Sequence, residues 1–230
     1  MSRNENRSQN ESLKNKSMVH SSHKTINVKE PVESQQLTNE NMIIEINDKT
    51  VSFTHLAERL HDTVTSLVLN KVKITGDDDA LYDFWRVLRG HPALRELSWS
   101  NVTFEDPNAD VGRLLGVAFV SCHKLTSVKL NGMHVPADAF KSAEYSANLR
   151  EICLSNDHYT DEEATTIAEA LARNPNIQEI DFRGNDITEQ GQKSFEARLS
   201  VNKSIRHITL DNLGAISKDK FRRQNSASAA

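Results

Sequence analysis

Two adjoining stretches of the chain, DEEATTIAEALAR at residues 161–173 and NIQEIDFRGNDIT at residues 176–188, contain the pattern that decides the fold. In the first stretch the apolar residues recur at intervals of three and four, which is the spacing of one face of a helix. These residues are Ala164, Ile167, Ala168 and Leu171. The second stretch contains Ile177-x-x-Ile180-x-Phe182, in which the last two apolar residues alternate as they do in a short strand. Together the two stretches predict one helix followed by one strand.

The strand pattern occurs six times along the chain, each time as three apolar residues in the arrangement L-x-x-L-x-L. The copies begin at Val64, Leu94, Leu125, Leu149, Ile177 and Ile205, so their spacings are 30, 31, 24, 28 and 28 residues. A weaker copy, Ile44-x-Ile46, precedes the first one. A unit of one strand and one helix cannot bury both of its apolar faces alone, but neighbouring units in a stack cover each other. The repeat therefore predicts an α/β solenoid of six or seven units.

The same two stretches resemble the leucine-rich repeats of the ribonuclease-inhibitor-like class, the long type of about 28 residues with a full helix in each repeat. The resemblance extends over residues 41–216, about three quarters of the chain. It implies a right-handed horseshoe in which parallel strands line the concave face and helices cover the convex face. Partners of this family usually dock on the concave face or on the adjoining loops, so the resemblance also implies where a binding site lies.

The chain departs from the family at the ninth place of the repeat, where family members usually carry Asn or Cys. Asn185 follows the family at this place. The other residues there are Lys49, Val72, Val102, Met133, Asp157 and Leu213. We therefore expect apolar packing to hold the loops of the early repeats. The spacing of 24 residues before Leu149 further predicts a shortened helix in the fourth repeat.

The two ends of the chain differ in composition from the repeats. Residues 1–40 contain no aromatic residue, no glycine and only eight apolar residues, too few to offset the entropy lost on folding, so we predict a disordered polar tail. Residues 217–230 are predicted to form a flexible basic tail with a net charge of +3. The whole chain carries −4 and residues 1–40 carry +1, which leaves −8 for the expected repeat domain at residues 41–216.

Composition excludes several classes of protein. A length of 230 residues with 37% hydrophobic and 26% charged residues fits one domain with tails. Two cysteines, Cys122 and Cys153, exclude a disulfide-rich secreted scaffold. No apolar run has the length of a bilayer span, and a pI of about 6.1 provides no general attraction to nucleic acid or anionic membranes. We therefore expect a cytoplasmic, intracellular protein that binds neither nucleic acid nor membrane.

The alternation along each strand assigns the residues that point outward on the concave face. In the C-terminal repeats these positions are charged, with both signs present. The candidate partner-binding residues are Lys129, Arg150, Glu151, Glu179, Asp181, Arg183, Arg206 and Asp211. A charged surface of mixed sign suits a protein partner, because such charges steer the encounter and select among partners. Charged residues on exposed strands also keep a solenoid in solution, and this alternative explanation stays open.

The sequence contains no catalytic or metal-binding motif. Asp77, Asp78 and Asp79 lack the remaining ligands of an EF-hand loop and fit a helix start, where the helix dipole favours acidic residues. The nine histidines are scattered, and none has the spacing of a zinc motif. Cys153 occupies an outward strand position, and Arg150 is its only evident flanking cation. The sequence therefore predicts no enzyme activity, no cofactor and no metal.

We expect a non-enzymatic interaction module, an adaptor that binds a protein partner, either as a monomer or as a member of a hetero-complex. Three other functions stay open. Residues 202–214 (NKSIRHITLDNLG) resemble the closing repeat of tropomodulin-type actin-capping domains, which favours a cytoskeletal regulator. The Ser- and Asn-rich N-terminus is similar to bacterial secretion signals, which favours a secreted effector that binds a host protein. A GTPase activator of the leucine-rich-repeat type is the third alternative, although no motif here places its functional groups.

Overall fold

The computed structural model of the chain describes residues 37–38, 41–211 and 214–217. The described residues all belong to one compact unit, which lies within residues 33–230. The expected repeat domain at residues 41–216 coincides with nearly all of the described part. Most of the two expected tails, residues 1–36 and 218–230, lies outside the described residues.

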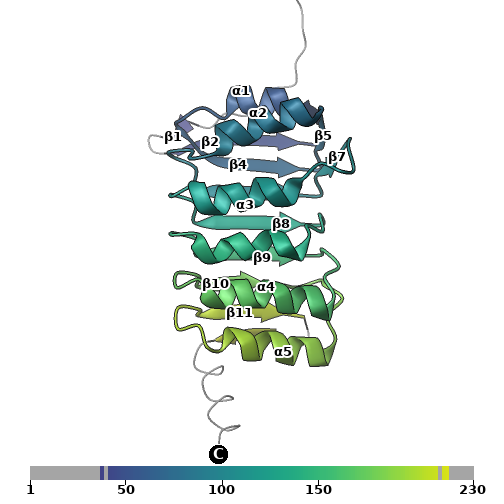
Figure 1. The fold of residues 1–230 in the computed structure, drawn as a ribbon, viewed down its shortest axis with the longest axis vertical. Coiled ribbons are helices and arrows are strands. Elements are labelled where there is room, and N and C mark those ends of the chain that lie inside the picture. Colours follow the sequence, from purple (N-terminus) through teal and green to yellow (C-terminus); the bar gives the residue numbers. More distant parts are fainter. Residues whose placement is uncertain (1–36, 39–40, 212–213, 218–230) are drawn as a thin grey trace, which may run out of the picture. The chain divides into compact units, whose positions relative to one another are not determined.

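One large sheet runs through this unit (Figure 1). Its nine strands follow the order β1-β2-β4-β6-β8-β9-β10-β11-β12. The seven inner strands are parallel, and β1 and β12 pair antiparallel at the two outer edges. The strand bounds are Leu37–Thr38 (β1), Asn41–Asn47 (β2), Val64–Asn70 (β4), Glu96–Ser100 (β6), Ser127–Asn131 (β8), Glu151–Ser155 (β9), Glu179–Asp181 (β10), His207–Leu210 (β11) and Gly214–Ser217 (β12). Each copy of the repeat pattern, including the weak copy at Ile44, therefore supplies one parallel strand.

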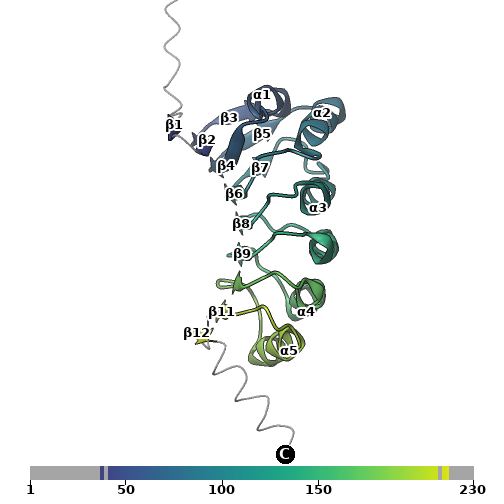
Figure 2. The ribbon, with the colours of Figure 1, turned by 90° about the vertical axis from the view of Figure 1, so that its left-hand side faces the viewer.

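Helices α1 to α5 all lie on the same side of the large sheet (Figure 2). The helices of this layer are α1 (Phe53–Arg59), α2 (Asp78–Leu88), α3 (Val111–Ser121), the 3-10 helix η1 (Ala137–Tyr145), α4 (Asp161–Arg173) and α5 (Glu189–Leu199). The core lies between this layer and the sheet. The inward residues in the middle of six neighbouring strands are at most 2% exposed, namely Leu67, Leu97, Val128, Ile152, Ile180 and Ile208. This register confirms the inward positions predicted from the strand alternation.

A second, smaller sheet joins the first three units. Its strands are β3 (Thr50–Ser52), β5 (Lys73–Thr75) and β7 (Thr103–Phe104), and they are parallel. Each follows a strand of the large sheet by a few residues, so the second sheet lies beside the edge at which the large strands end. We call this edge the strand-end edge and the opposite one the strand-start edge. The sequence patterns did not predict the second sheet.

A residue with left-handed backbone conformation follows six of the parallel strands. Its φ lies between 51° and 71°, and the residues are Asp48, Lys71, Asn101, Gly132, Asn156 and Gly184. In the first four turns the backbone N–H of this residue donates to the last residue of the next strand, as Asn101 does to the carbonyl of Asn131 at 2.7 Å. Glycine, Asn and Asp adopt this conformation at least cost, whereas Lys71 has no such preference. The turn directs the chain from each strand toward the helix layer.

The shortened helix lies in the third repeat, so the expectation of a shortened helix in the fourth repeat is wrong. The 3-10 helix η1 lies between β8 and β9, whereas the fourth repeat contains α4, which has 13 residues. The 24-residue spacing separates the starts at Leu125 and Leu149, so the missing length falls on the segment between them. A 3-10 helix rises about 2.0 Å per residue, against 1.5 Å in an α-helix, so a short segment still spans the helix layer.

Candidate functional site

The face of the large sheet opposite the helices is bare in the described part of the chain (Figure 2). Its outward residues form rows that cross the strands in register. The first row is Ile43, Ser66, Glu96, Ser127, Glu151, Glu179 and His207. The central row is Glu45, Val68, Ser98, Lys129, Cys153, Asp181 and Thr209. These rows match the outward positions predicted from the sequence, and we call this surface the bare face.

Lys129 occupies the middle of the bare face and pairs with two carboxylates. Its Nζ lies 3.5 Å from Oε1 of Glu96 and 3.2 Å from Oε2 of Glu151. The Ser127 hydroxyl donates to the same oxygen of Glu151 at 2.9 Å. Burial tends to lower the pKa of Lys129, but the hydrogen bond and charges of Glu151 and Glu96 outweigh it and raise the pKa. The charge of Lys129 is therefore used within the protein.

Asp181 and Arg183 form a second internal pair, at the end of β10. Nε and Nη2 of Arg183 donate to the two carboxylate oxygens of Asp181 at 2.9 and 2.6 Å. Burial tends to raise the pKa of Asp181, but the hydrogen bonds and charge of Arg183 prevail and hold it below its ordinary value. Like Lys129, Arg183 is thus neutralised by a neighbour.

Cys153 lies between these two pairs in the central row. Burial raises the pKa of its thiol, and the nearby charges of Asp181 and Glu151 act in the same direction. Its Sγ lies 3.5 Å from the Ser155 hydroxyl. A thiol with a raised pKa is mostly protonated near neutral pH and is a poor nucleophile.

The remaining acidic candidates have different surroundings. Glu179 is exposed and lies in register between Glu151 on one side and His207 on the other. Asp211 accepts a hydrogen bond from the backbone N–H of Gly184 at 2.7 Å. In earlier units a main-chain carbonyl accepts the equivalent bond, so Asp211 closes the hydrogen-bond ladder of the strand-end edge. Glu179 is therefore free for a partner in a way that Asp211 is not.

Arg150 and Arg206 lie at the strand-start edge and not in the rows of the bare face. Each directly precedes a strand, and its backbone N–H donates to the preceding unit, to Thr126 and to Gln178 respectively, both at 2.8 Å. Both side chains are exposed. The sequence prediction grouped them with the concave residues, and the structure places them beside that face, one position before its first row.

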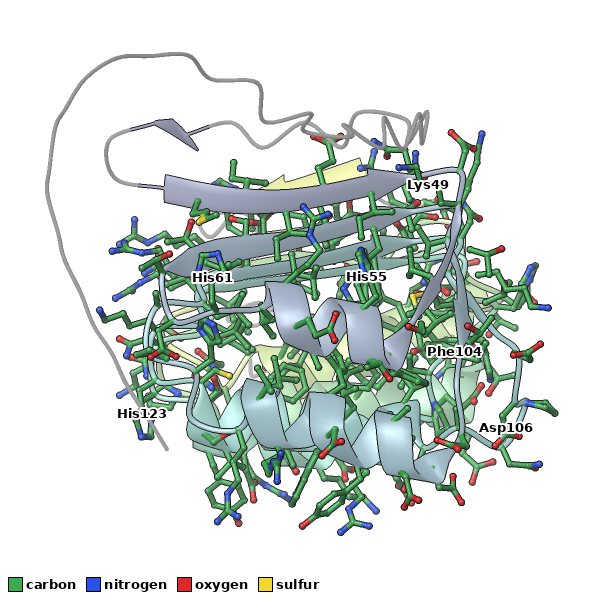
Figure 3. The ribbon with its side chains drawn as sticks, turned by 90° about the horizontal axis from the view of Figure 1, so that it is seen from above. Lys49, His55, His61, Phe104, Asp106 and His123 are labelled. Carbon is green, nitrogen blue, oxygen red and sulfur yellow. The ribbon has the colours of Figure 1, made fainter. Side chains whose placement is uncertain are left out.

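A ladder of polar side chains at the strand-start edge was missed by the sequence analysis. It consists of His61, His91, Cys122, Ser146, Asn174 and Asn202, each three residues before a repeat start. Seen along the stack, His61 and His123 lie at one edge, and Lys49, Phe104 and Asp106 at the other (Figure 3). Asn174 is fully buried, and its Nδ2 donates to the carbonyls of Ala143 and Ser146 at 2.7 and 2.9 Å. The constant offset of three residues before each repeat start was the signal in the sequence that indicates this ladder. The residue types at these positions differ, and the side chains have a structural role.

A hollow of about 760 Å³ lies on the helix side, over α2, α3 and η1. Trp85 lines it, with the guanidinium groups of Arg89 and Arg113 at 5.8 and 5.4 Å from its ring centroid. Two glycines of α3, Gly112 and Gly116, also line it, and they allow η1 to approach closely. The indole Nε1 is buried without a hydrogen-bond partner among the described residues. The sequence analysis did not identify this hollow.

The acidic run at residues 77–79 begins α2, as expected, and Asp77 caps the helix by accepting from the N–H of Ala80 at 3.0 Å. In the described residues, no three His, Cys, Asp or Glu side chains are arranged to hold a metal ion. None of the helices in the described ranges combines the length and apolar composition needed to cross a bilayer. Comparison of the chain with protein-family models and with curated proteins finds no match.

Proposed function

We propose that this chain is a leucine-rich-repeat protein of the ribonuclease-inhibitor-like class whose bare face is the concave surface of a horseshoe. In this proposal it is a non-enzymatic adaptor that binds a protein partner through the bare face and the adjoining edges. It acts inside the cell, as a monomer or as part of a hetero-complex.

The observation that carries this proposal is the bare face itself. Parallel sheets are normally covered on both faces, because their strands are apolar on both sides. Here one face is packed under the helices, while the other presents polar and charged rows with no covering element in the described residues. A rigid, uncovered sheet of this kind offers a preformed surface, which lowers the entropic cost of binding.

The charges of the bare face indicate the chemistry of its partner. Carboxylates outnumber cations in its two rows, and the cation of the central row, Lys129, already bridges Glu96 and Glu151. The group of Glu96, Lys129 and Glu151 keeps a net negative charge and Glu179 adds another, so the surface that remains is acidic. Basic or hydrogen-bond-donating groups of a protein partner would complement it.

A binding role is favoured over a catalytic one by the state of the candidate reactive groups. The thiol of Cys153 has a raised pKa, and the pKa of Asp181 is lowered beside Arg183. A general acid or base works best with a pKa near the working pH, and a nucleophilic thiol needs a lowered one. These shifts run against both requirements.

The test is affinity capture from a native lysate with the full chain as bait, followed by mass spectrometry. The full chain is needed because β1 and Ser217 of β12 lie outside residues 41–216. The bare-face variant combines Glu151→Gln, Glu179→Gln and Asp181→Asn. The control variant combines Asp83→Asn, Glu169→Gln and Glu189→Gln, which changes the charge equally on the helix side.

A protein retained by the wild type and the control but lost with the bare-face variant would support the proposal. Its affinity should fall by about tenfold or more when remeasured with purified proteins, because the variant removes three negative charges from the bare face. A partner retained equally by both variants would exclude the bare face as the binding site.

A further inference from the structure

Most Lys and Arg side chains of residues 41–211 already have a partner within the protein. Ion pairs with carboxylates are formed by Lys71, Lys73, Arg86, Lys129, Lys141, Arg173, Arg183, Lys193 and Arg198. Lys49, Arg59 and Lys203 also have an interaction. Arg89 and Arg113 stack on the ring of Trp85. Few cations in this range are therefore available to a ligand.

The cations that remain unpaired within the described residues gather at one place. They are Arg95, Lys124, Arg150 and Arg206, and all four are exposed. All four lie in the segments that lead into strands β6, β8, β9 and β11, and so at the strand-start edge. No carboxylate of the described part lies within ion-pair distance of these four cations, whereas the other Lys and Arg side chains of residues 41–211 have a partner.

Three of these cations form a regular row. The backbone ladder runs from Arg95 through Thr126, Arg150 and Gln178 to Arg206, since each N–H donates to the preceding carbonyl at 2.8 Å. An arginine thus directly precedes every second strand of this stretch, namely β6, β9 and β11. Neighbouring strands lie about 4.8 Å apart, so the three arginines recur at intervals of about 10 Å. Lys124 lies two residues before Thr126 and adds a positive charge between Arg95 and Arg150.

The helix dipole does not account for this row. Basic residues stabilise a helix only within its last turn, the position that Arg173 occupies in α4 and Arg198 in α5. Arg150 and Arg206 lie beyond η1 and α5, at the starts of strands. Their guanidinium groups form no ion pair in the described part of the chain and are exposed, so they are available to an external anion.

The surroundings favour an acidic protein segment over nucleic acid. Glu96 directly follows Arg95, and Glu151 directly follows Arg150. Glu179 lies between Glu151 and His207 in the first row of the bare face. A nucleic acid carries a charge on every nucleotide and would be repelled by these carboxylates. A peptide can place isolated carboxylates on the arginines and direct basic or neutral groups to the glutamates.

We propose that the strand-start edge binds an extended acidic segment of the protein partner, with carboxylates at about every third residue. In the extended polyproline II conformation a chain has three residues per turn and advances about 3.1 Å per residue, so every third side chain lies on the same face, at an interval of about 9 Å that is close to the interval between the arginines. The planar guanidinium group binds a carboxylate through two hydrogen bonds, which makes arginine the suitable cation for this contact. The inference rests on the proposed protein-binding function and names the chemistry of its partner.

The test uses fluorescence anisotropy with the full chain and a labelled peptide that carries Glu at every third position and Ser or Gly between. The edge variant combines Arg95→Gln, Arg150→Gln and Arg206→Gln. The control variant combines Arg86→Gln, Arg173→Gln and Arg198→Gln, which removes the same charge from cations that are paired on the helix side. A salt concentration of about 20 mM limits screening.

We expect the edge variant to bind the peptide about tenfold or more weakly than the wild type, and the control variant to bind within about twofold. Circular dichroism should show both variants folded, because the replaced side chains are exposed. Equal weakening in both variants would mean that binding follows net charge alone, and would overturn the proposal. It would also be overturned if the wild type did not bind the peptide, or bound single-stranded oligo-dT of equal length more tightly.

The outcome is separable from that of the capture experiment. If the captured partner is lost with the bare-face variant but retained by the edge variant, the binding function stands and the acidic segment is refuted. If the peptide binds as expected while no protein is captured through the bare face, the edge is a binding site and the bare face is not.

Discussion

The two halves of the strand-end edge hold their loops in different ways. In the N-terminal half, the second sheet joins the backbone of each loop directly to the next. The N–H of Thr103 donates to the carbonyl of Val72 at 2.9 Å, and the N–H of Glu105 to that of Ile74 at 2.8 Å. Val72 and Val102 are buried in these loops, as expected for loops that apolar packing helps to hold.

In the C-terminal half, side chains make these connections instead. The amide of Asn185 donates to the carbonyls of Leu154 and Phe182 at 2.7 and 2.9 Å. Its oxygen accepts from the N–H groups of Asp157 and Tyr159, both at 3.1 Å. Asp157 acts in the same way one repeat earlier, where its Oδ1 accepts from the N–H of Met133 at 2.7 Å.

This difference between the two halves shows where the stability of the fold depends on single side chains. Buried backbone groups need partners, because each unpaired group costs about 1–3 kcal/mol. The hydrogen bonds of the second sheet join main-chain atoms and survive a change of side chain. Those of Asn185 disappear with the side chain, so the C-terminal half should be the more sensitive one to mutation.

Asn185→Ala should have the largest effect. The change removes four hydrogen bonds at once and leaves loop N–H and carbonyl groups without their partner. We expect the free energy of unfolding to fall by about 3 kcal/mol. Urea denaturation followed by circular dichroism measures this change.

Asn108→Ala is the matched control in the N-terminal half. The side chain of Asn108 is exposed, and among the residues that the structure describes it bonds to Asp106 alone, at 3.2 Å. This variant should stay within about 0.5 kcal/mol of the wild type. Similar losses in the two variants would show that the two halves do not differ as described.

Val102→Asn should have a smaller effect, and tests the N-terminal half directly. It introduces the equivalent of Asn185 into a loop whose backbone is already paired by the second sheet. Val102 is only 4% exposed, so the new amide would be buried without a partner. We expect a loss of about 2 kcal/mol in urea denaturation.

Val102→Ala provides the comparison, because it removes the apolar contact without adding a polar group. Its loss should be the smaller of the two. If Val102→Asn were as stable as the wild type, the loop would contain free donors and acceptors that an asparagine can use, and the two halves would be alike.

The apolar repeat was sufficient to predict the parallel strands, their register and the outward residues of the bare face. Each unit has one strand and one helix, and Leu97, Val128 and Ile152 must all be buried. These two conditions leave little freedom in the register of neighbouring strands. The length of each helix was predicted less well: the 24-residue spacing between Leu125 and Leu149 contains the shortened helix, whereas the prediction placed it in the repeat that begins at Leu149.

The second sheet and the pairing within the site could not be predicted in the same way. Strands β3, β5 and β7 have two or three residues each, too few to show an alternating pattern. The contacts of Lys129 with Glu96 and Glu151 depend on side-chain conformations across three strands. The position of Arg150 beside the bare face, and not on it, depends on where β9 begins, and boundaries are the least certain part of any sequence pattern.

Asp157→Asn should have the smallest effect of these substitutions, and it should stabilise the protein. Asp157 is buried, and its Oδ2 has no hydrogen-bond partner among the described residues. An asparagine amide at that place could donate to the carbonyl of Leu130, the residue that pairs with Leu154 in the sheet, as Asn185 does to Leu154. We expect a gain of about 1 kcal/mol near neutral pH, measured by urea denaturation.

The pH dependence of this gain identifies its cause. Burial raises the pKa of Asp157 above its value in the unfolded chain, although hydrogen bonds from Met133 and His134 oppose the shift. Folding therefore favours the protonated acid, and the wild type loses stability as the pH rises from the ordinary pKa of an aspartate through the raised one. Asp157→Asn has no such loss, so its advantage should grow with pH across this window and then level off. An advantage that is constant from acid to neutral pH would mean that Asp157 is not a source of pH-dependent instability in the C-terminal half.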